Sequence, residues 1–128
     1  RRTPRSTLFP SPPLFRSHRI LSKSSRPLLK VAALISLEHH EHWNGAGYPF
    51  GKSGKDISIA GRIACICDVF DALSSKRPYK EAWELGRVFE YMSNQRGGMF
   101  DPELVDALML EASAFSSIAE TLKDEPRD

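Results

Sequence analysis

The fold that this sequence predicts is decided by residues 58–73, which read SIAGRIACICDVFDAL. Apolar side chains occur on nearly every side of a helix built from this stretch, and such a helix belongs in the centre of a bundle. Asp68 is the exception, because an ionised carboxylate among apolar side chains costs several kcal/mol unless it is paired, hydrogen-bonded or bound to a cation. The stretch therefore predicts a central helix that carries one carboxylate with a special partner.

Helical patterns also lie on both sides of this segment. An apolar face that begins after Pro27 predicts one helix, and another is expected near residues 83–94. The triplet Asp101-Pro102-Glu103 is a helix start signal. The helix that follows is expected to present one apolar face made by Leu104, Leu108, Ala112 and Phe115. No strand alternation stands out, so the predicted fold class is all-α, a helical bundle.

Charge is distributed unevenly along the 128 residues. Residues 1–30 carry eight Lys or Arg and no acid, whereas residues 31–128 hold ten basic and sixteen acidic side chains, a net charge of −6. The basic excess belongs to one end of the chain, which argues against a domain that binds a nucleic-acid polymer. No apolar run approaches the ~18 residues of a membrane span, so no membrane segment is expected.

Cys65 and Cys67 are the only cysteines. On a helix they lie about 200° apart, so they are not expected to bridge each other. Two reduced, packed thiols are typical of a cytoplasmic protein, with a metal or redox role as the alternative.

Residues 1–26 differ from the rest because they are rich in Arg, Ser and Pro and show no apolar periodicity. Such a segment buries too little surface to offset its ordering entropy. Three interpretations remain: a disordered arm, an organellar transit peptide, or non-native sequence from a wrong frame or a truncation, which the missing initial Met favours. We therefore expect a tail over 1–26, a helical domain over 27–122 and a polar tail over 123–128.

A histidine pair and an aspartate are difficult to explain by packing alone. His39 and His40 end an apolar helix, point about 100° apart and could each bind a neighbouring metal, although an exposed pair without a ligand role is the alternative. Asp68 could bind a metal or form a buried salt bridge to Arg62. Asp71 lies one turn after Asp68 and could orient whatever Asp68 holds.

Two loop segments add to these candidates. The loop Gly45-Ala46-Gly47-Tyr48-Pro49 combines backbone freedom with a stacking ring close to the histidines. The segment Lys76-Arg77-Pro78-Tyr79-Lys80 places three cations after the aspartate helix. Those cations could stabilise the helix C-terminus or receive phosphate oxygens.

Four motifs together resemble a known family. Residues 39–49, HHEHWNGAGYP, resemble the HHExxDGxGYP signature that names the HD-GYP family, and residues 60–75, AGRIACICDVFDALSS, resemble its "ARI…ADxFDALTS" helix. Residues 77–80, RPYK, and 97–102, GGMFDP, match its next two elements in order. The resemblance extends from about Leu28 to Leu110.

This resemblance implies a helical domain of the HD-domain/phosphodiesterase type. Such a domain holds two or three divalent ions, iron or manganese above all, and hydrolyses cyclic di-GMP or a related cyclic dinucleotide in bacterial second-messenger signalling. GGDEF-type or other signalling proteins are implied as partners. No catalytic side chain is expected beyond the metal ligands. The implied roles are metal ligands for His39, His40 and Asp68, phosphate contacts for Arg77 and Lys80, and a pocket-shaping loop for Gly47, Tyr48 and Pro49.

The family's opening elements are not matched. The family begins with a His-Asp pair and a lysine, HDxGK, and then has another ligand histidine. When Ile20-Leu21 is aligned with the family's helix, Pro13 stands where that histidine belongs, and His18 lies five positions too late. A second difference lies in the motif at residues 39–49, where Asn44 replaces an Asp. The resemblance is therefore expected to fade within the stretch 19–28. We interpret the chain as a partial HD-GYP domain that lacks the N-terminal half. Alone, such a fragment is expected to have little or no activity. The alternative is a non-catalytic module that binds a cyclic dinucleotide or a partner protein.

Overall fold

The structure, a computed structural model, describes residues 12–123. Its helices are α2 (Pro12–Ser22), α3 (Pro27–Glu38), α4 (Ile59–Ser74), α5 (Leu85–Asn94), α6 (Pro102–Leu110) and α7 (Ala112–Lys123), with a short 3₁₀ helix at Gly54–Asp56. Within this range no strand forms, so the predicted all-α class is confirmed. The same range contains no helix long and apolar enough to cross a membrane.

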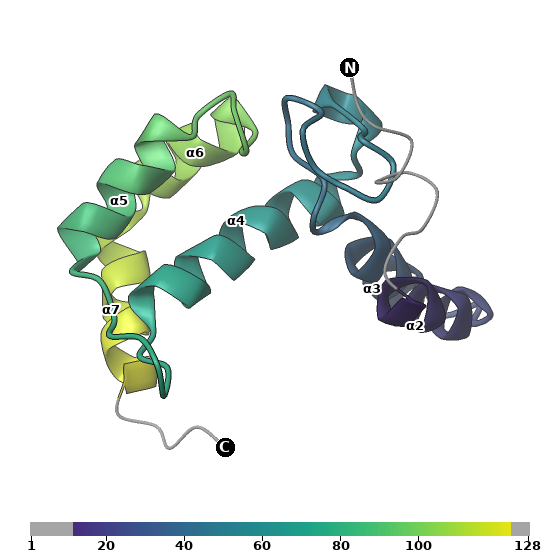
Figure 1. The fold of residues 1–128 in the computed structure, drawn as a ribbon, viewed down its shortest axis with the longest axis horizontal. Coiled ribbons are helices and arrows are strands. Elements are labelled where there is room, and N and C mark those ends of the chain that lie inside the picture. Colours follow the sequence, from purple (N-terminus) through teal and green to yellow (C-terminus); the bar gives the residue numbers. More distant parts are fainter. Residues whose placement is uncertain (1–11, 124–128) are drawn as a thin grey trace.

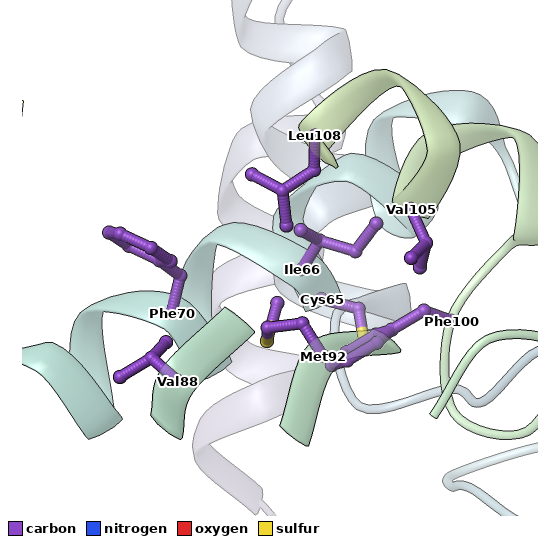
Figure 2. Close-up of a cluster of buried hydrophobic side chains, with 8 residues drawn as sticks. All are labelled: Cys65, Ile66, Phe70, Val88, Met92, Phe100, Val105 and Leu108. Atoms are coloured by element: carbon purple, nitrogen blue, oxygen red, sulfur yellow. The ribbon is translucent and has the colours of Figure 1, made fainter. Parts of the chain in front are cut away.

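Helix α4 connects the two ends of the molecule: α3 lies near its beginning, and α5, α6 and α7 form the other part of the molecule (Figure 1). It begins where the sequence predicts, because the Ser58 hydroxyl accepts a hydrogen bond from the Gly61 amide at 3.1 Å and so caps the first turn. Figure 2 shows the apolar core that α4 shares with the helices after it. The buried core residues are Cys65, Ile66, Phe70, Val88, Met92, Phe100, Val105 and Leu108.

Part of the α4 surface is open to solvent in the described part of the chain. Ile59 is 51% exposed and Ile63 is 46% exposed, and Cys67 and Asp68 are exposed as well. The prediction of a helix enclosed on all sides is therefore wrong for residues 12–123. The physical reason is that the buried core covers only part of the helix: Ile63 and Cys67 line a pocket against Leu104 and Leu108 of α6 and stay exposed there.

The two cysteines of α4 differ in their burial. Both are free thiols, as predicted, but only Cys65 is buried. Burial, with a smaller contribution from the Asp68 carboxylate, raises the pKa of Cys65 to about 11, so this thiol stays protonated at neutral pH. The prediction of two packed thiols therefore holds for Cys65 and is wrong for Cys67.

Helix α2 occupies part of the segment for which the sequence predicts a tail. It lies beside α3 (Figure 1), and the His18 ring Nδ1 donates a hydrogen bond to the Ala33 carbonyl at 3.0 Å. The Phe15 ring meets the Phe50 ring edge to face at 6.1 Å. Residues 12–22 are thus helical instead of a disordered arm, while residues 1–11 and 124–128 lie outside the described residues. The boundary at residue 26 stays a prediction.

The C-terminal helical segment differs from the sequence prediction. A single helix with one face from Leu104 to Phe115 was expected, but α6 ends at Leu110 and α7 begins at Ala112. At the break, the Glu111 amide hydrogen bonds to the carbonyls of Ala107 and Leu108, at 3.1 and 3.2 Å. This bifurcated bond is typical of a tightened last turn, so the prediction of one continuous helix is wrong.

Candidate metal centre

The end of α3 places His39 in the geometry of a metal ligand. Its Nδ1–H donates a hydrogen bond of 2.7 Å to the Ile35 carbonyl, one helical turn earlier. That bond fixes the tautomer and directs the lone pair of Nε2 away from the helix. Metal-binding histidines in proteins are oriented in the same way, by a bond from their second nitrogen to a backbone carbonyl or carboxylate.

Asp68 faces the same pocket as His39. The pocket lies between α3 and α4, has a volume of about 360 Å³, and is lined by Ala32, Ile35, Ser36, His39, Ala64 and Asp68. The sequence prediction that Asp68 is embedded among apolar side chains is wrong, because its residue is exposed. The alternative partner is also wrong: Arg62 pairs with Asp101 at 2.6 Å instead. The exposed Asp68 carboxylate and the oriented His39 imidazole thus line one pocket.

The His40 ring contacts two other rings. Its imidazole centroid is 3.9 Å from that of His39 and 4.8 Å from that of Tyr48, with the Tyr48 ring nearly parallel at 24°. Burial lowers the pKa of His40 below its usual value; the neighbouring His39 adds to this effect and the Asp68 carboxylate opposes it. A lowered pKa favours the neutral imidazole, which is the form that binds metals.

Glu38 joins α3 to the start of α4, a role that the sequence reasoning missed. Its side chain is 3% exposed and accepts hydrogen bonds from the Lys52 ammonium at 2.9 Å and from the Ser58 amide at 2.6 Å. Burial raises the pKa of Glu38, but the hydrogen bonds from Lys52 and Ser58 outweigh it, so the pKa lies below its usual value. Gly61 permits this approach, because a Cβ there would lie 2.7 Å from the Glu38 Cβ.

The loop between α3 and α4 folds back onto the turn that carries the histidines. The Tyr48 amide donates to the His40 carbonyl at 3.1 Å, and the peptide bond between Tyr48 and Pro49 is cis. Pro49 is buried, whereas Tyr48 is 45% exposed. The predicted pocket loop therefore lies directly against the histidines, as its closeness in sequence suggested.

The first residues of this loop form hydrogen bonds with the segment before α6. The amides of Trp43 and Asn44 donate to the carbonyls of Met99 and Gly98, at 3.0 and 2.9 Å. The Asn44 side-chain oxygen accepts from the Ala46 amide at 2.9 Å, so it retains the turn-forming ability expected of the Asp it replaces. These bonds connect two motifs that are more than fifty residues apart in the chain.

The predicted phosphate-binding cations lie just after α4. The Arg77 guanidinium is 3.5 Å from an Asp71 oxygen, and Asp71 also accepts a 3.1 Å bond from the Ser75 hydroxyl. The Lys80 ammonium donates to the carbonyls of Ala72, at 3.0 Å, and Glu81, at 3.3 Å. Lys80 thus satisfies a carbonyl at the end of α4, the simpler of its two predicted roles. The roles of Asp71 in orienting Asp68 and of both cations in binding phosphate stay predictions.

The donor chemistry of the site fits a divalent cation as part of a ligand set. Within residues 12–123, no group of three or more His, Cys, Asp or Glu side chains is arranged to hold a metal ion by itself. His39 and Asp68, which share one pocket, supply an imidazole nitrogen and a carboxylate oxygen. Both donor types suit first-row divalent metals.

Comparison with known proteins places these features in a family. The HD domain family matches residues 14–104. A cyclic di-GMP phosphodiesterase response regulator of Xanthomonas campestris is 49% identical over 72% of this chain and 24% of its own length. A 3'3'-cGAMP-specific phosphodiesterase of Vibrio cholerae is 45% identical over 82% of the chain and 20% of its length, and a cyclic di-GMP phosphodiesterase of Thermotoga maritima 39% over 84% and 29%. The chain thus spans about a quarter of the length of these curated relatives.

The family match begins at residue 14 and so includes most of α2. The prediction that the resemblance fades within the stretch 19–28 is therefore wrong. The match also contains both halves of the pocket, since His39 and Asp68 lie inside it. HD domains are phosphohydrolases that depend on divalent metals, which agrees with the donor types found here. The chain belongs to the HD domain family, and its motifs place it among the HD-GYP proteins.

Proposed function

We propose that this chain contributes the metal- and phosphate-binding residues of an enzyme that hydrolyses a cyclic dinucleotide, with cyclic di-GMP as the substrate. One observation carries the proposal: the oriented His39 imidazole and the Asp68 carboxylate line the same pocket between α3 and α4. The relatives described above, which are named as cyclic di-GMP or cGAMP phosphodiesterases, support the choice of substrate class. A cytoplasmic location and signalling-protein partners of the GGDEF type belong to the same proposal.

The proposed cofactor is two or three iron or manganese ions, for which His39, His40 and Asp68 supply part of the ligand set. When bound, such ions stabilise the negative charge that develops on a phosphodiester during hydrolysis. The chain's own contribution is orientation. The Ile35 carbonyl holds the His39 ring, and the rings of His39 and Tyr48 hold the His40 ring. A pre-oriented ligand loses less entropy when it binds.

The proposed phosphate contacts are Arg77 and Lys80. Asp71, whose carboxylate is 3.5 Å from the Arg77 guanidinium, lies three residues after Asp68 on α4 and hence one turn along the same face. A guanidinium can bind two phosphate oxygens at once, whereas an ammonium acts as a compact charge. Arg77 is 43% exposed at its side chain and can therefore exchange the weak 3.5 Å contact with Asp71 for a phosphate.

The proposal is tested by a single-turnover assay with the chain in excess over cyclic di-GMP, with Mn²⁺ or with anaerobic Fe²⁺. We expect slow, metal-dependent formation of the linear dinucleotide, lost in His39→Ala and in Asp68→Ala because each removes a ligand. Arg77→Ala is expected to weaken binding of cyclic di-GMP about tenfold, as the loss of a charge-assisted bond would. Asp56→Ala, which removes an exposed carboxylate outside the pocket, serves as the control.

The assay also separates the alternative function. Binding of cyclic di-GMP without any linear product, abolished by Arg77→Ala and Lys80→Ala, would replace catalysis with a binding module. A chain that neither binds nor cleaves cyclic di-GMP in the presence of metal would contradict the proposal itself.

A further inference from the structure

Glu41 is a buried carboxylate that the proposed chemistry does not use. Its side chain is 1% exposed, and its two oxygens accept hydrogen bonds from two separate backbone amides. Oε2 accepts from Phe50 at 2.8 Å and Oε1 from Lys52 at 2.9 Å. Hydrogen bonds to an ionised acceptor are stronger than neutral ones, and a buried carboxylate requires such partners. Glu41 therefore fastens residues 50–52 to the turn that follows α3.

The fastened loop is packed without spare room against the histidine turn. A Cβ on Gly47 would lie 2.2 Å from the His40 carbonyl oxygen, 2.5 Å from the His42 nitrogen and 2.7 Å from the Glu41 Cα. The Tyr48 amide donates to the same His40 carbonyl at 3.1 Å. On the N-terminal side of Tyr48 the loop is held by the close backbone packing of Gly47. On the C-terminal side it is held by the hydrogen bonds from Phe50 and Lys52 to the Glu41 carboxylate. Together these contacts set the position of the Tyr48 ring.

The Tyr48 ring in turn limits the orientation of the His40 imidazole. The two rings stack at 4.8 Å and 24°, and the second ring neighbour of His40 is the His39 ring at 3.9 Å. His39 is oriented by its hydrogen bond to the Ile35 carbonyl. Among residues 12–123, the ring of His40 is held by ring contacts in place of a hydrogen bond. Stacking geometry is therefore what selects the direction of its nitrogens.

We propose that Glu41 is a positioning residue for the His40 imidazole, acting through the loop at residues 47–52 and the Tyr48 ring. The carboxylate holds the loop, the loop holds the Tyr48 ring, and the ring holds His40. The inference rests on the proposed function only in taking His40 as a metal ligand. The orientation of the ring itself can be measured without metal.

The first measurement is the NMR chemical shift of the His40 Cε1–H in metal-free protein, which reports the ring current of Tyr48. Glu41→Gln retains the side-chain shape, but its carboxamide can accept from only one of the two amides and directs an NH₂ at the other. We expect this variant to lose most of the Tyr48 ring-current shift although Tyr48 is unchanged. Tyr48→Phe, which keeps the ring, should retain the shift. Glu90→Gln, an exposed change of the same chemistry, is the control.

The second measurement is Mn²⁺ affinity, at a temperature where each variant keeps its helical circular dichroism. Loss of an orienting partner typically lowers metal affinity about ten- to a hundredfold. We expect Glu41→Gln and Tyr48→Leu each to weaken Mn²⁺ binding at least about tenfold, and the double variant to be little worse than either, because both act along one chain of contacts. Additive losses would contradict that dependence.

The outcomes separate this inference from the proposed function. An unshifted His40 signal in Glu41→Gln, or wild-type Mn²⁺ affinity in Tyr48→Leu, overturns the positioning role. If Glu41→Gln does not fold, wild-type Mn²⁺ affinity in Tyr48→Leu still overturns the inference, because Glu41 is proposed to act on His40 only through the Tyr48 ring. If the wild-type chain binds no Mn²⁺, the proposed function fails, whereas the metal-free shift of His40 still supports or overturns the inference.

Discussion

Gly47→Ala is expected to lower the free energy of unfolding by about 3 kcal/mol, at the upper end of what an overpacked site costs. The added Cβ would lie 2.2 Å from the His40 carbonyl oxygen and within 2.7 Å of two further backbone atoms. Backbone atoms cannot move aside as the end of a flexible side chain can, so the loop must leave the histidine turn. The variant should therefore also lose the stacking of Tyr48 on His40.

Chemical denaturation followed by circular dichroism measures this loss, and the chain supplies a matched control. Gly86 lies near the start of α5, and a Cβ there would meet no atom within 4 Å. Gly86→Ala should change stability by less than about 1 kcal/mol, in the stabilising direction, because alanine restricts the unfolded chain. Equal effects of the two substitutions would show that the loop does not pack against the histidine turn as described.

Arg62→Met is expected to destabilise the protein by about 3–5 kcal/mol, the range found when one partner of a buried ion pair is removed. The Arg62 side chain is 14% exposed and its partner Asp101 is 4% exposed. Arg62 also donates to the Ile57 carbonyl at 3.0 Å, so it connects the entry to α4 with the entry to α6. Methionine preserves the packing of the arginine stem but leaves the Asp101 carboxylate buried without its cation.

A double-mutant cycle identifies the pair as the cause. Asp101→Asn retains the ability to cap α6 through the Glu103 amide, at 2.9 Å in the native protein, and removes the charge. The double variant should be clearly more stable than the sum of the single losses predicts. Arg96→Met, which breaks an exposed pair with Asp106, should have a much smaller effect because solvent screens that pair. A small effect of Arg62→Met, equal to that of Arg96→Met, would contradict the structural role of the buried pair.

Local signals were sufficient to predict the helices that carry the site. Pro27 at the first turn of α3 and the Asp101 cap of α6 appear where the sequence predicts them, and α4 begins within one residue of the predicted start at residue 58. Those local signals do not predict that His39 and Asp68 line the same pocket. The shared pocket depends on how α3 crosses α4, and the small Gly61 and the Glu38 bonds fix that approach.

The incorrect or missing expectations for Arg62, Glu38 and Glu41 share a physical cause, because each of these residues depends on a partner distant in sequence. Arg62 lies only six residues before Asp68 in sequence, yet it pairs with Asp101 from the start of α6. Glu38 and Glu41 read as ordinary polar residues, although both are buried by a loop that folds back over them. One sequence signal could have identified Glu38 and Glu41. They flank two histidines, and a glycine-rich loop follows whose backbone amides need acceptors. The break at Glu111 has no Gly or Pro to mark it.

We propose that a divalent metal binds at the α3–α4 pocket through His39 and Asp68, which line it, and through the neighbouring His40. A titration of the ¹⁵N-labelled chain with substoichiometric Mn²⁺, followed by amide line broadening, tests it most directly, because paramagnetic broadening falls steeply with distance from the ion. We predict that the amides of these three residues broaden first, and that His39→Ala together with Asp68→Ala removes the effect. Broadening centred on exposed carboxylates such as Asp56 and Glu90, unchanged in the double variant, would contradict the claim.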